Sequence, residues 1–251
     1  MLKEDAVKQS CLTIRENKKI ASGIYRMILV GDASEAMRPG SFVNIRLQGR
    51  FLRRPISVCD ADDSGLTIIY KVLGGGTRYM ATLAPGTLLD VLSGLGNGFD
   101  ISKSGSSPLL IGGGVGAPPM YMLAKRLINA GTKPFVILGS NTSAEVFYVD
   151  EFKTLGCAVT VTTADGSEGV KGFVTDAVPL DGYTFVYACG PEPMLRAVYK
   201  KTVTGGEFSF EERMGCGFGA CMGCSCKTVT GYKRICRDGP VLDKEEILWE
   251  D

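Results

Sequence analysis

The sequence of 251 residues contains no histidine. Without an imidazole side chain, the chain cannot supply a histidine general base, a Ser-His-Asp triad, or a histidine ligand to zinc, haem or a Rieske cluster. An excess of one charge sign is also lacking, because the formal net charge is +1, and nucleic-acid-binding proteins usually carry a basic surface. No apolar run approaches the roughly 20 residues of a membrane-spanning helix. We therefore expect no nucleic-acid partner, no membrane span, and a chemistry that depends on bound groups.

The N-terminal residues include Lys3, Glu4 and Asp5 and lack the apolar core of a signal peptide. We therefore expect a cytoplasmic protein. Thiols are kept reduced in that compartment, so a dense group of cysteines indicates a metal site rather than disulfides. Of the nine cysteines, most of those outside the region 216–236 stand in strand-like apolar surroundings. We expect these to be small core residues, namely Cys11, Cys59 and Cys157.

The hydrophobic pattern divides the chain into regions of different fold class. Short β-rich runs separated by turn residues occupy residues 24–30, 42–47, 66–72 and 87–92. Strands at this spacing predict an antiparallel β-barrel or sandwich, and we expect the barrel. Farther along, strands at 108–111, 135–138, 158–162 and 185–188 alternate with helical patterns at 119–130 and near 144–155. This alternation predicts a parallel α/β sheet.

Two changes of pattern suggest the domain boundaries. Residues 102–107 are polar and have no periodicity, so we place the end of the barrel domain at residue 103 and the α/β domain at 104–205. From residue 206 to 251 glycine and cysteine dominate, and there is little apolar material for a separate core. A small segment of this kind usually needs a metal to fold, so we expect a third domain built around one.

The cysteines of this third segment follow the pattern C-x4-C-x2-C…C, formed by Cys216, Cys221, Cys224 and Cys236. This spacing is typical of plant-type [2Fe–2S] ferredoxins. A structural zinc site, the alternative, usually shows paired C-x2-C spacings. Cys226 fits no position of the pattern, and we expect it not to be a ligand. Glycines beside the ligands let backbone N–H groups approach the sulfur atoms, and they are Gly215, Gly217, Gly219 and Gly223.

A flavin site is suggested by two segments of the predicted barrel. An arginine next to a proline is expected to close one strand, and a triple glycine followed by threonine comes after another. Guanidinium groups pair with phosphate, and a glycine–threonine loop offers N–H and hydroxyl donors. Extended backbone on either side could bind the edge of a flat ring. The candidate residues are Arg54, Pro55, Ile56, Ser57, Ile69, Tyr70, Lys71, Gly76 and Thr77.

A nucleotide loop follows the first strand of the α/β region and opens a helix. Its candidate residues are Gly112, Gly113, Gly114 and Gly116. Such glycines permit close approach of backbone to a pyrophosphate, which also benefits from the positive end of the helix. The second strand ends without the acidic residue of the dehydrogenase fingerprint. Because neither lysine nor arginine lies between Gly139 and Asp150, NADH is favoured over NADPH.

A further strand ends in Cys189, Gly190 and Pro191. The order of the motifs R-P-I-S, G-x-G-T, G-x-G-x-x-P and C-G-P resembles that of the ferredoxin–NADP reductase superfamily. The resemblance implies FAD on the first two motifs and a nicotinamide nucleotide on the last two. It also implies that Cys189 and Gly190 lie beside the nicotinamide ring, whereas the bare sequence would allow a simple strand-to-helix turn with a buried thiol.

A closer resemblance covers essentially the whole chain. Residues 211–221, with 53–57, 95–99, 164–167 and 172–176, are similar to the electron-transfer subunits of NAD-dependent (class 1B) dihydroorotate dehydrogenases. This resemblance implies transfer of electrons from an FMN-containing catalytic subunit through the [2Fe–2S] cluster and FAD to NAD⁺, in pyrimidine biosynthesis. It further implies a heterotetramer with two subunits of each kind, and no catalytic residue for dihydroorotate in this chain.

Two other functions remain open at the level of sequence. One is a reductase subunit of an NADH-dependent ferredoxin–NADP or sulfide oxidoreductase complex, which would share the same architecture. The other is a binding module held together by zinc without redox activity. The residues facing a partner decide the first question, and the colour of the purified protein decides the second, because zinc is colourless.

Overall fold

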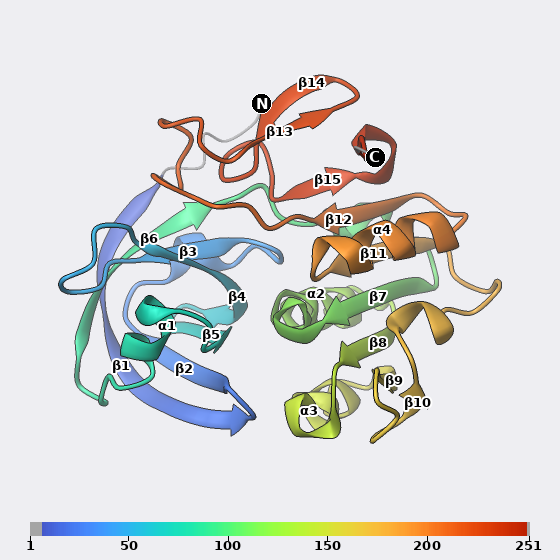
Figure 1. Ribbon diagram of the computed structural model, residues 1–251, viewed down its shortest axis with the longest axis horizontal. Helices are drawn as coiled ribbons and strands as arrows, with labels where there is room; N and C mark the ends of the chain where they lie inside the picture. The colour runs from blue at the N-terminus through green and yellow to red at the C-terminus, as the bar shows by residue number, and fades with distance from the viewer. Residues whose placement is uncertain (1–6, 250–251) are drawn as a thin grey trace.

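The computed structural model describes residues 7–249, and it consists of a barrel and an α/β sheet side by side with the C-terminal segment lying across both (Figure 1). The barrel is closed and antiparallel, with the strand order β1-β2-β5-β4-β3-β6. This confirms the predicted β-barrel. Its strands are β1 (Lys8–Ala21), β2 (Ile24–Val30), β3 (Phe42–Ile45), β4 (Arg54–Asp62), β5 (Gly65–Lys71) and β6 (Leu88–Leu95).

Alternation along the strands decides which side chains enter the barrel core. On β1, Leu12 and Ile14 are 1% exposed and point inward. Their neighbour Cys11 is exposed, so the expectation that Cys11 is a core residue was wrong. Cys59 and Cys157 are buried as expected. Arg54 begins strand β4, whereas the sequence suggested that residues 54–57 close a strand.

The second unit is a seven-stranded sheet in the order β10-β9-β8-β7-β11-β12-β15, in which only β15 runs antiparallel to its neighbour. The predicted parallel α/β region is thereby confirmed. Helix α2 contacts both β4 of the barrel and β7 of the sheet, so it joins the two units (Figure 1). The strands and helices are β7 (Pro108–Gly113), α2 (Ala117–Asn129), β8 (Phe135–Ser140), α3 (Val149–Thr154), β9 (Ala158–Thr163), β10 (Val170–Lys171), β11 (Phe185–Cys189), α4 (Glu192–Lys201), β12 (Gly206–Ser209) and β15 (Val241–Asp243).

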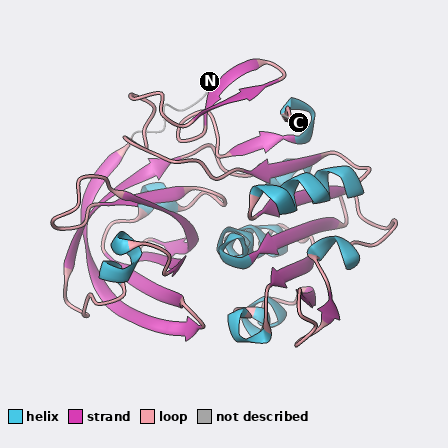
Figure 2. Ribbon diagram, viewed as in Figure 1, coloured by secondary structure: helices cyan, strands magenta, loops and turns pink. Residues whose placement is uncertain are grey.

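Short helical turns occupy several connections (Figure 2). One α-helical turn, α1 (Gly75–Met80), follows strand β5. The 3₁₀ turns are η1 (Ser34–Ala36), η2 (Ile101–Lys103), η3 (Gly114–Gly116), η4 (Ser143–Glu145), η5 (Val174–Asp176) and η6 (Lys244–Glu246). Among residues 7–249, none of the helices has the length and apolar character needed to cross a membrane.

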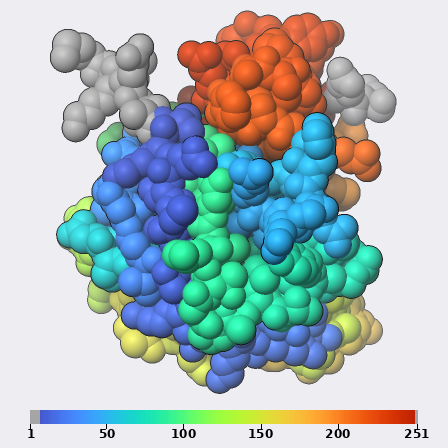
Figure 3. All heavy atoms as spheres, turned by 90° about the vertical axis from the view of Figure 1, so that its left-hand side faces the viewer, coloured from blue at the N-terminus to red at the C-terminus, as the bar shows by residue number. Residues whose placement is uncertain are grey.

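The cysteine segment, residues 210–240, connects β12 to β15 and contains one hairpin, β13 (Ser225–Thr228) and β14 (Gly231–Arg234). Its buried side chains, among them Ile235, pack with Phe42 of the barrel and Val186 of the sheet in one hydrophobic cluster. The strands on either side of the segment belong to the seven-stranded sheet. The region after residue 205 therefore shares its core with both other units, and Figure 3 shows it seated directly on the barrel.

Candidate functional site

A cleft of about 950 Å³ lies between the barrel and the sheet, and part of the cysteine segment also lines it. The sequence-predicted flavin and nucleotide residues come together here from separate parts of the chain. With the exception of Gly112, all of them line the cleft, namely Arg54, Pro55, Ile56, Ser57, Ile69, Tyr70, Lys71, Gly76, Thr77, Gly113, Gly114, Gly116, Cys189 and Gly190.

Arg54 provides a positive charge on the barrel side of the cleft. Its Nη1 donates to the carbonyl oxygens of Leu52, at 2.6 Å, and Arg53, at 3.2 Å. Within residues 7–249 its guanidinium forms no ion pair with a carboxylate. A Cβ atom on Gly76 would stand 2.1 Å from Nε of Arg54, so only glycine lets the loop approach the guanidinium this closely. A guanidinium that lines the cleft without a carboxylate partner among the described residues suits an anionic group such as a diphosphate.

Thr77 lines the cleft and also makes local hydrogen bonds. Its hydroxyl accepts hydrogen bonds from the backbone N–H groups of Leu73, at 3.0 Å, and Gly74, at 3.2 Å. The hydroxyl therefore shapes the turn into α1.

On strand β5, which precedes this turn, Tyr70 is 1% exposed and its hydroxyl donates to Oδ1 of Asn17 at 2.8 Å. Burial raises the pKa of Tyr70, so the phenol stays neutral.

The glycine loop of the sheet lies where β7, η3 and α2 meet. A Cβ atom on Gly116 would stand 2.1 Å from the carbonyl oxygen of Cys189, so this turn and the end of β11 touch backbone to backbone. Gly112 lies beneath the loop. There a Cβ atom would stand 2.7 Å from Cα of Ala117, so this glycine allows the helix to pack on the strand. The loop itself leaves backbone exposed to the cleft, as close approach to a pyrophosphate requires.

Cys189 ends β11, lines the cleft and is 8% exposed. Burial raises the pKa of its thiol to about 12, against a smaller opposing effect of the Ser209 hydroxyl. A thiol with this pKa is uncharged at neutral pH and is a poor nucleophile. Cys189 can therefore offer a neutral, polarisable surface to a flat ring.

Several residues of the cleft were not found by the sequence reasoning. They are Glu145, Thr162, Ser209, Glu211 and Met214. Thr162 and Ser209 lie at or near the carboxyl ends of parallel strands, where ligands of open α/β sheets bind, so their position could have identified them. The Thr162 hydroxyl is buried and has no hydrogen-bond partner among the described residues. It is thus available to a ligand in the cleft.

The four predicted ligands of the cysteine segment lie in two pairs. The N–H groups of Ala220 and Cys221 donate to Sγ of Cys216 at 3.2 and 3.4 Å, and the N–H of Cys216 donates to Sγ of Cys221 at 3.4 Å. In the second pair, the N–H of Cys236 donates to Sγ of Cys224 at 3.4 Å. The members of this second pair are buried, each 2% exposed.

The contacts of the first pair suit a thiolate at Cys216. Burial disfavours the charged form of the Cys216 thiol, but hydrogen bonds from backbone N–H groups of the loop outweigh it and lower the pKa to about 6. Two iron ions that share four cysteines each take two of them, so a [2Fe–2S] cluster needs its ligands in two pairs. The paired arrangement fits a [2Fe–2S] cluster.

Cys226 stands apart from the loop that carries the pairs. It lies on β13, where it pairs with Lys233 of β14. Its side chain is half-buried, and burial raises the pKa of its thiol. Burial also raises the pKa of the predicted ligand Cys236, to about 12, so it is the place of Cys226 in the hairpin, and not its pKa, that sets it apart from the four predicted ligands. That Cys226 is not a ligand stays a prediction.

Two family models match separate parts of the chain. Residues 211–248 match the iron-sulfur cluster binding domain of dihydroorotate dehydrogenase B. Residues 110–200 match an oxidoreductase NAD-binding domain. The first covers the cysteine segment and the second covers the glycine loop and Cys189, so each matched region contains the geometry that its description requires.

Solved structures resemble the fold over most of the chain. The NADH-dependent reduced ferredoxin-NADP oxidoreductase structure superposes with a TM-score of 0.87 and 32% identity, covering 96% of this chain and 90% of that chain. Phthalate dioxygenase reductase superposes with a TM-score of 0.64 and 18% identity, covering 90% of this chain and 88% of that chain. The second likeness concerns the fold alone.

Curated relatives are similar over nearly their full length. The dihydroorotate dehydrogenase B (NAD(+)) electron transfer subunit of Fusobacterium nucleatum subsp. nucleatum is 44% identical, and the match covers 94% of this chain and 96% of that protein. The subunit of the same name from a Geobacillus species is 42% identical, with 96% of this chain and 99% of that protein covered. The chain belongs to the family of dihydroorotate dehydrogenase B (NAD(+)) electron transfer subunits.

Proposed function

We propose that this chain carries electrons between a [2Fe–2S] cluster on Cys216, Cys221, Cys224 and Cys236 and NAD, through FAD in the cleft. The observation that carries the proposal is the continuity of the two sites. Met214 and Pro240 line the cleft, and they lie two residues before Cys216 and four residues after Cys236. FAD can exchange electrons in pairs with nicotinamide and singly with a cluster, which is the chemistry needed at this junction.

The barrel, residues 1–103, would hold FAD. Arg54 would pair with its diphosphate, because the guanidinium has no carboxylate partner among residues 7–249. The backbone of residues 54–57 and 69–71 would bind the edge of the ring, with Gly76 and Thr77 shaping the adjacent turn. Buried Tyr70 and its neighbours on β5 would exclude water from that side.

The α/β region, residues 104–205, would hold NAD. Gly113, Gly114 and Gly116 would lie against the pyrophosphate, and Gly112 would support them by letting α2 pack on β7. Cys189 and Gly190 would contact the nicotinamide with a neutral thiol and bare backbone. Since Glu145 lines the cleft beyond the end of β8, a 2′-phosphate would meet a carboxylate there, which favours NADH over NADPH.

Residues 206–251 would hold the cluster. The backbone N–H groups that donate to Cys216 and Cys221 would stabilise the negative charge of the thiolates. The remaining thiol of this region, Cys226, would stay uncoordinated. We propose a cytoplasmic location, a compartment in which thiols are kept reduced.

The partner would be the catalytic subunit of dihydroorotate dehydrogenase B, the enzyme whose electron transfer subunits are relatives of this chain. We propose that this partner contains FMN, that two subunits of each kind form a heterotetramer, and that the complex acts in pyrimidine biosynthesis. Oxidation of dihydroorotate would take place in the partner. The cluster would then accept electrons at the surface of the cysteine segment.

A second candidate function has one observation in its favour. The NADH-dependent reduced ferredoxin-NADP oxidoreductase structure is 32% identical over 96% of this chain. The identity to the dihydroorotate dehydrogenase B subunits is higher, at 42–44%. We therefore retain the dihydroorotate dehydrogenase partner as the main proposal and leave the distinction to the experiment.

The test uses the purified chain with and without the catalytic subunit. Alone, it should contain FAD and two iron ions, oxidise NADH with an artificial dye, and fail to oxidise dihydroorotate. Adding the catalytic subunit should produce dihydroorotate-dependent NADH formation. Cys216→Ser should abolish that formation while preserving the NADH–dye reaction. Zinc in place of iron, or coupled activity with ferredoxin and NADP⁺ but not with dihydroorotate, would overturn the proposal.

A further inference from the structure

Asn44 lies on β3 between the barrel and the cysteine segment. Its neighbours Val43 and Ile45 point into the barrel core, whereas Phe42 joins the hydrophobic cluster of the cysteine segment. By alternation, the Asn44 side chain is on the outer face of the barrel with Phe42. It is nevertheless only 1% exposed. An amide in so dry a place needs an explanation, because burial of polar groups is unfavourable without partners.

The amide contacts the cluster loop directly. Nδ2 of Asn44 donates to the backbone carbonyl oxygen of Cys216 at 3.2 Å, a bond between residues 172 positions apart. The next residue, Gly217, has φ of +81°, and a Cβ atom there would stand 2.3 Å from Nδ2. Glycine is therefore required for the loop to close onto the amide. The loop that carries the first predicted ligand is shaped around this side chain.

The backbone of Asn44 belongs to the flavin side. In the register of β3 with β4, Asn44 lies opposite Pro55 and Ile45 lies opposite Arg54. Asn44 thus lies next to both proposed cofactor sites. Its backbone is paired with the strand of the proposed flavin site, and its side chain bonds to the loop of the proposed cluster. Its Oδ1 is buried without a partner among the described residues. The Asn44 amide therefore donates a hydrogen bond from Nδ2 to the loop, while its Oδ1 stays buried without a hydrogen bond from any described residue.

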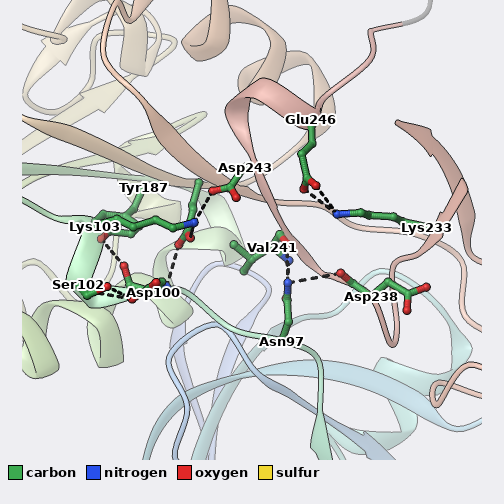
Figure 4. A network of polar contacts seen from close by, with 11 residues as sticks. Asn97, Asp100, Ser102, Lys103, Tyr187, Lys233, Asp238, Val241, Asp243 and Glu246 are labelled. Atoms are coloured by element: carbon green, nitrogen blue, oxygen red, sulfur yellow. Dashed lines mark hydrogen bonds and ion pairs between the residues drawn. The ribbon is translucent and has the colours of Figure 1, made fainter. Parts of the chain in front are cut away.

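A second barrel asparagine holds the other end of the cysteine segment (Figure 4). The N–H of Asn97 donates to the carbonyl oxygen of Gly239 at 2.7 Å. Its Nδ2 donates to the carbonyl oxygen of Val241 at 2.7 Å, and its Oδ1 accepts from the N–H of Val241 at 3.0 Å. All of these contacts lie after the last predicted ligand, Cys236. Asn97 therefore anchors the segment, whereas Asn44 touches the loop that holds the cluster.

We propose that Asn44 is a positioning residue for electron transfer between the flavin and the cluster. It fixes the peptide of Cys216 against the strand next to the flavin strand, and it turns the positive end of its amide dipole toward the cluster loop. This inference rests on the proposed function, because it takes Cys216 as a cluster ligand. Hydrogen bonds and dipoles near the sulfur atoms set the potential of such clusters, so losing the donor should lower it.

The test compares Asn44→Leu with wild type in the full chain. Leucine has the same number of heavy atoms and the same branching at Cγ as asparagine, and it removes the unpaired acceptor together with the donor, so we expect the barrel to fold normally. Iron and FAD contents should stay at wild-type levels, and NADH–dye turnover should change by less than about twofold. Hydride from NADH brings two electrons to the flavin, and the cluster accepts one of them. We expect this reduction of the cluster to slow at least about tenfold in stopped-flow absorbance, with a lower midpoint potential and altered EPR g-values.

Two further variants serve as a control and as a conservative replacement of Asn44. Ser93→Ala removes a different buried polar group of the barrel, a hydroxyl whose Oγ donates to the carbonyl oxygen of Lys8 on β1. It should leave the cluster signals unchanged. Asn44→Gln keeps the donor and should recover part of the reduction rate, and it replaces Asn44→Leu if that variant loses its cluster.

An unchanged reduction rate and midpoint potential in Asn44→Leu, with the wild-type chain containing iron, would overturn this inference alone. Equal effects of Asn44→Gln and Asn44→Leu on rate and potential would also overturn it, because retention of the donor would then not matter. Absence of iron from the wild-type chain would instead overturn the proposed function.

Discussion

Lys71 and Glu145 form an ion pair across the cleft, with 2.7 Å between Nζ and the carboxylate. Lys71 is the last residue of β5 in the barrel, and Glu145 ends the turn η4 beyond strand β8 of the sheet. The second carboxylate oxygen accepts a hydrogen bond from Nδ2 of Asn141 at 3.0 Å. The pair therefore links the flavin side to the nucleotide side at the edge of the cleft, and its charges bear on both stability and specificity.

The first prediction concerns the pH dependence of stability. The hydrogen bond from Lys71 is the main cause that holds the pKa of Glu145 below its ordinary value of 4.5, although burial acts in the opposite direction. A carboxyl whose pKa is lowered by folding stabilises the protein above its unfolded pKa and loses this effect as the pH falls through the folded pKa. Glu145→Gln should therefore lower the free energy of unfolding by about 0.5–1 kcal/mol at pH 7. This difference should shrink below about pH 4.5 in thermal or urea unfolding.

The control for this measurement is Asp150→Asn, whose carboxylate side chain is 95% exposed. It should show no comparable difference at any pH. A stability difference for Glu145→Gln that persists undiminished at pH 3 would mean that packing, and not the ion pair, is responsible.

The second prediction concerns the choice of nucleotide. Glu145 holds Lys71 in an ion pair, so a 2′-phosphate at this edge of the cleft would meet no free cation. Glu145→Gln frees Lys71 to pair with such a phosphate, which is worth about 1 kcal/mol or roughly fivefold in affinity, so kcat/KM for NADPH in the dye reaction should rise about fivefold. The value for NADH should fall or stay constant. Unchanged discrimination between the two nucleotides, with Asp150→Asn as reference, would show that the ribose binds elsewhere.

The third prediction concerns retention of FAD. Arg54→Ala removes the guanidinium that faces the cleft, and loss of a charge-assisted pair costs about 1.5–3 kcal/mol. FAD should then dissociate on dilution or gel filtration, with a Kd about 10- to 100-fold higher by fluorescence titration. Arg46→Ala is a matched control. The Arg46 side chain is 71% exposed, and its ion pair with Asp90 is long, with 3.8 Å between Nη1 and Oδ2. If Arg54→Ala keeps one FAD per chain after dilution, Arg54 does not bind FAD and has only a structural role in the barrel.

The fourth prediction separates the ligands from the spare thiol. Cys221→Ser should abolish the iron content and the visible circular dichroism of the cluster, because serine is a poor iron ligand in place of a thiolate. The barrel and the sheet should still fold, since β12 and β15 are strands of the sheet and not of the cysteine loop. Cys226→Ser should keep both signals. Bleaching of Cys226→Ser would require a new assignment of the third or fourth ligand.

Local features of the sequence were sufficient for much of this structure. Alternation predicted the barrel strands, and the change to a helical period predicted the parallel sheet, because both patterns depend on neighbours along the chain. Cysteine spacing pointed to the cluster loop for the same reason. One prediction failed because the phase of a pattern was misjudged. Cys11 is exposed because Leu12 and Ile14 occupy the inward positions of β1.

What the sequence by itself determined is therefore the set of elements, the type of each and the chemistry of the motifs, since these depend on residues a few positions apart. The tertiary structure alone decided which residues meet across those elements. The pairing of Lys71 with Glu145, the place of Gly112 beneath its loop and the bond from Asn44 to Cys216 all follow from how the barrel, the sheet and the cysteine segment pack. Packing brings together side chains far apart in the sequence, and no local pattern records which of them will be in contact.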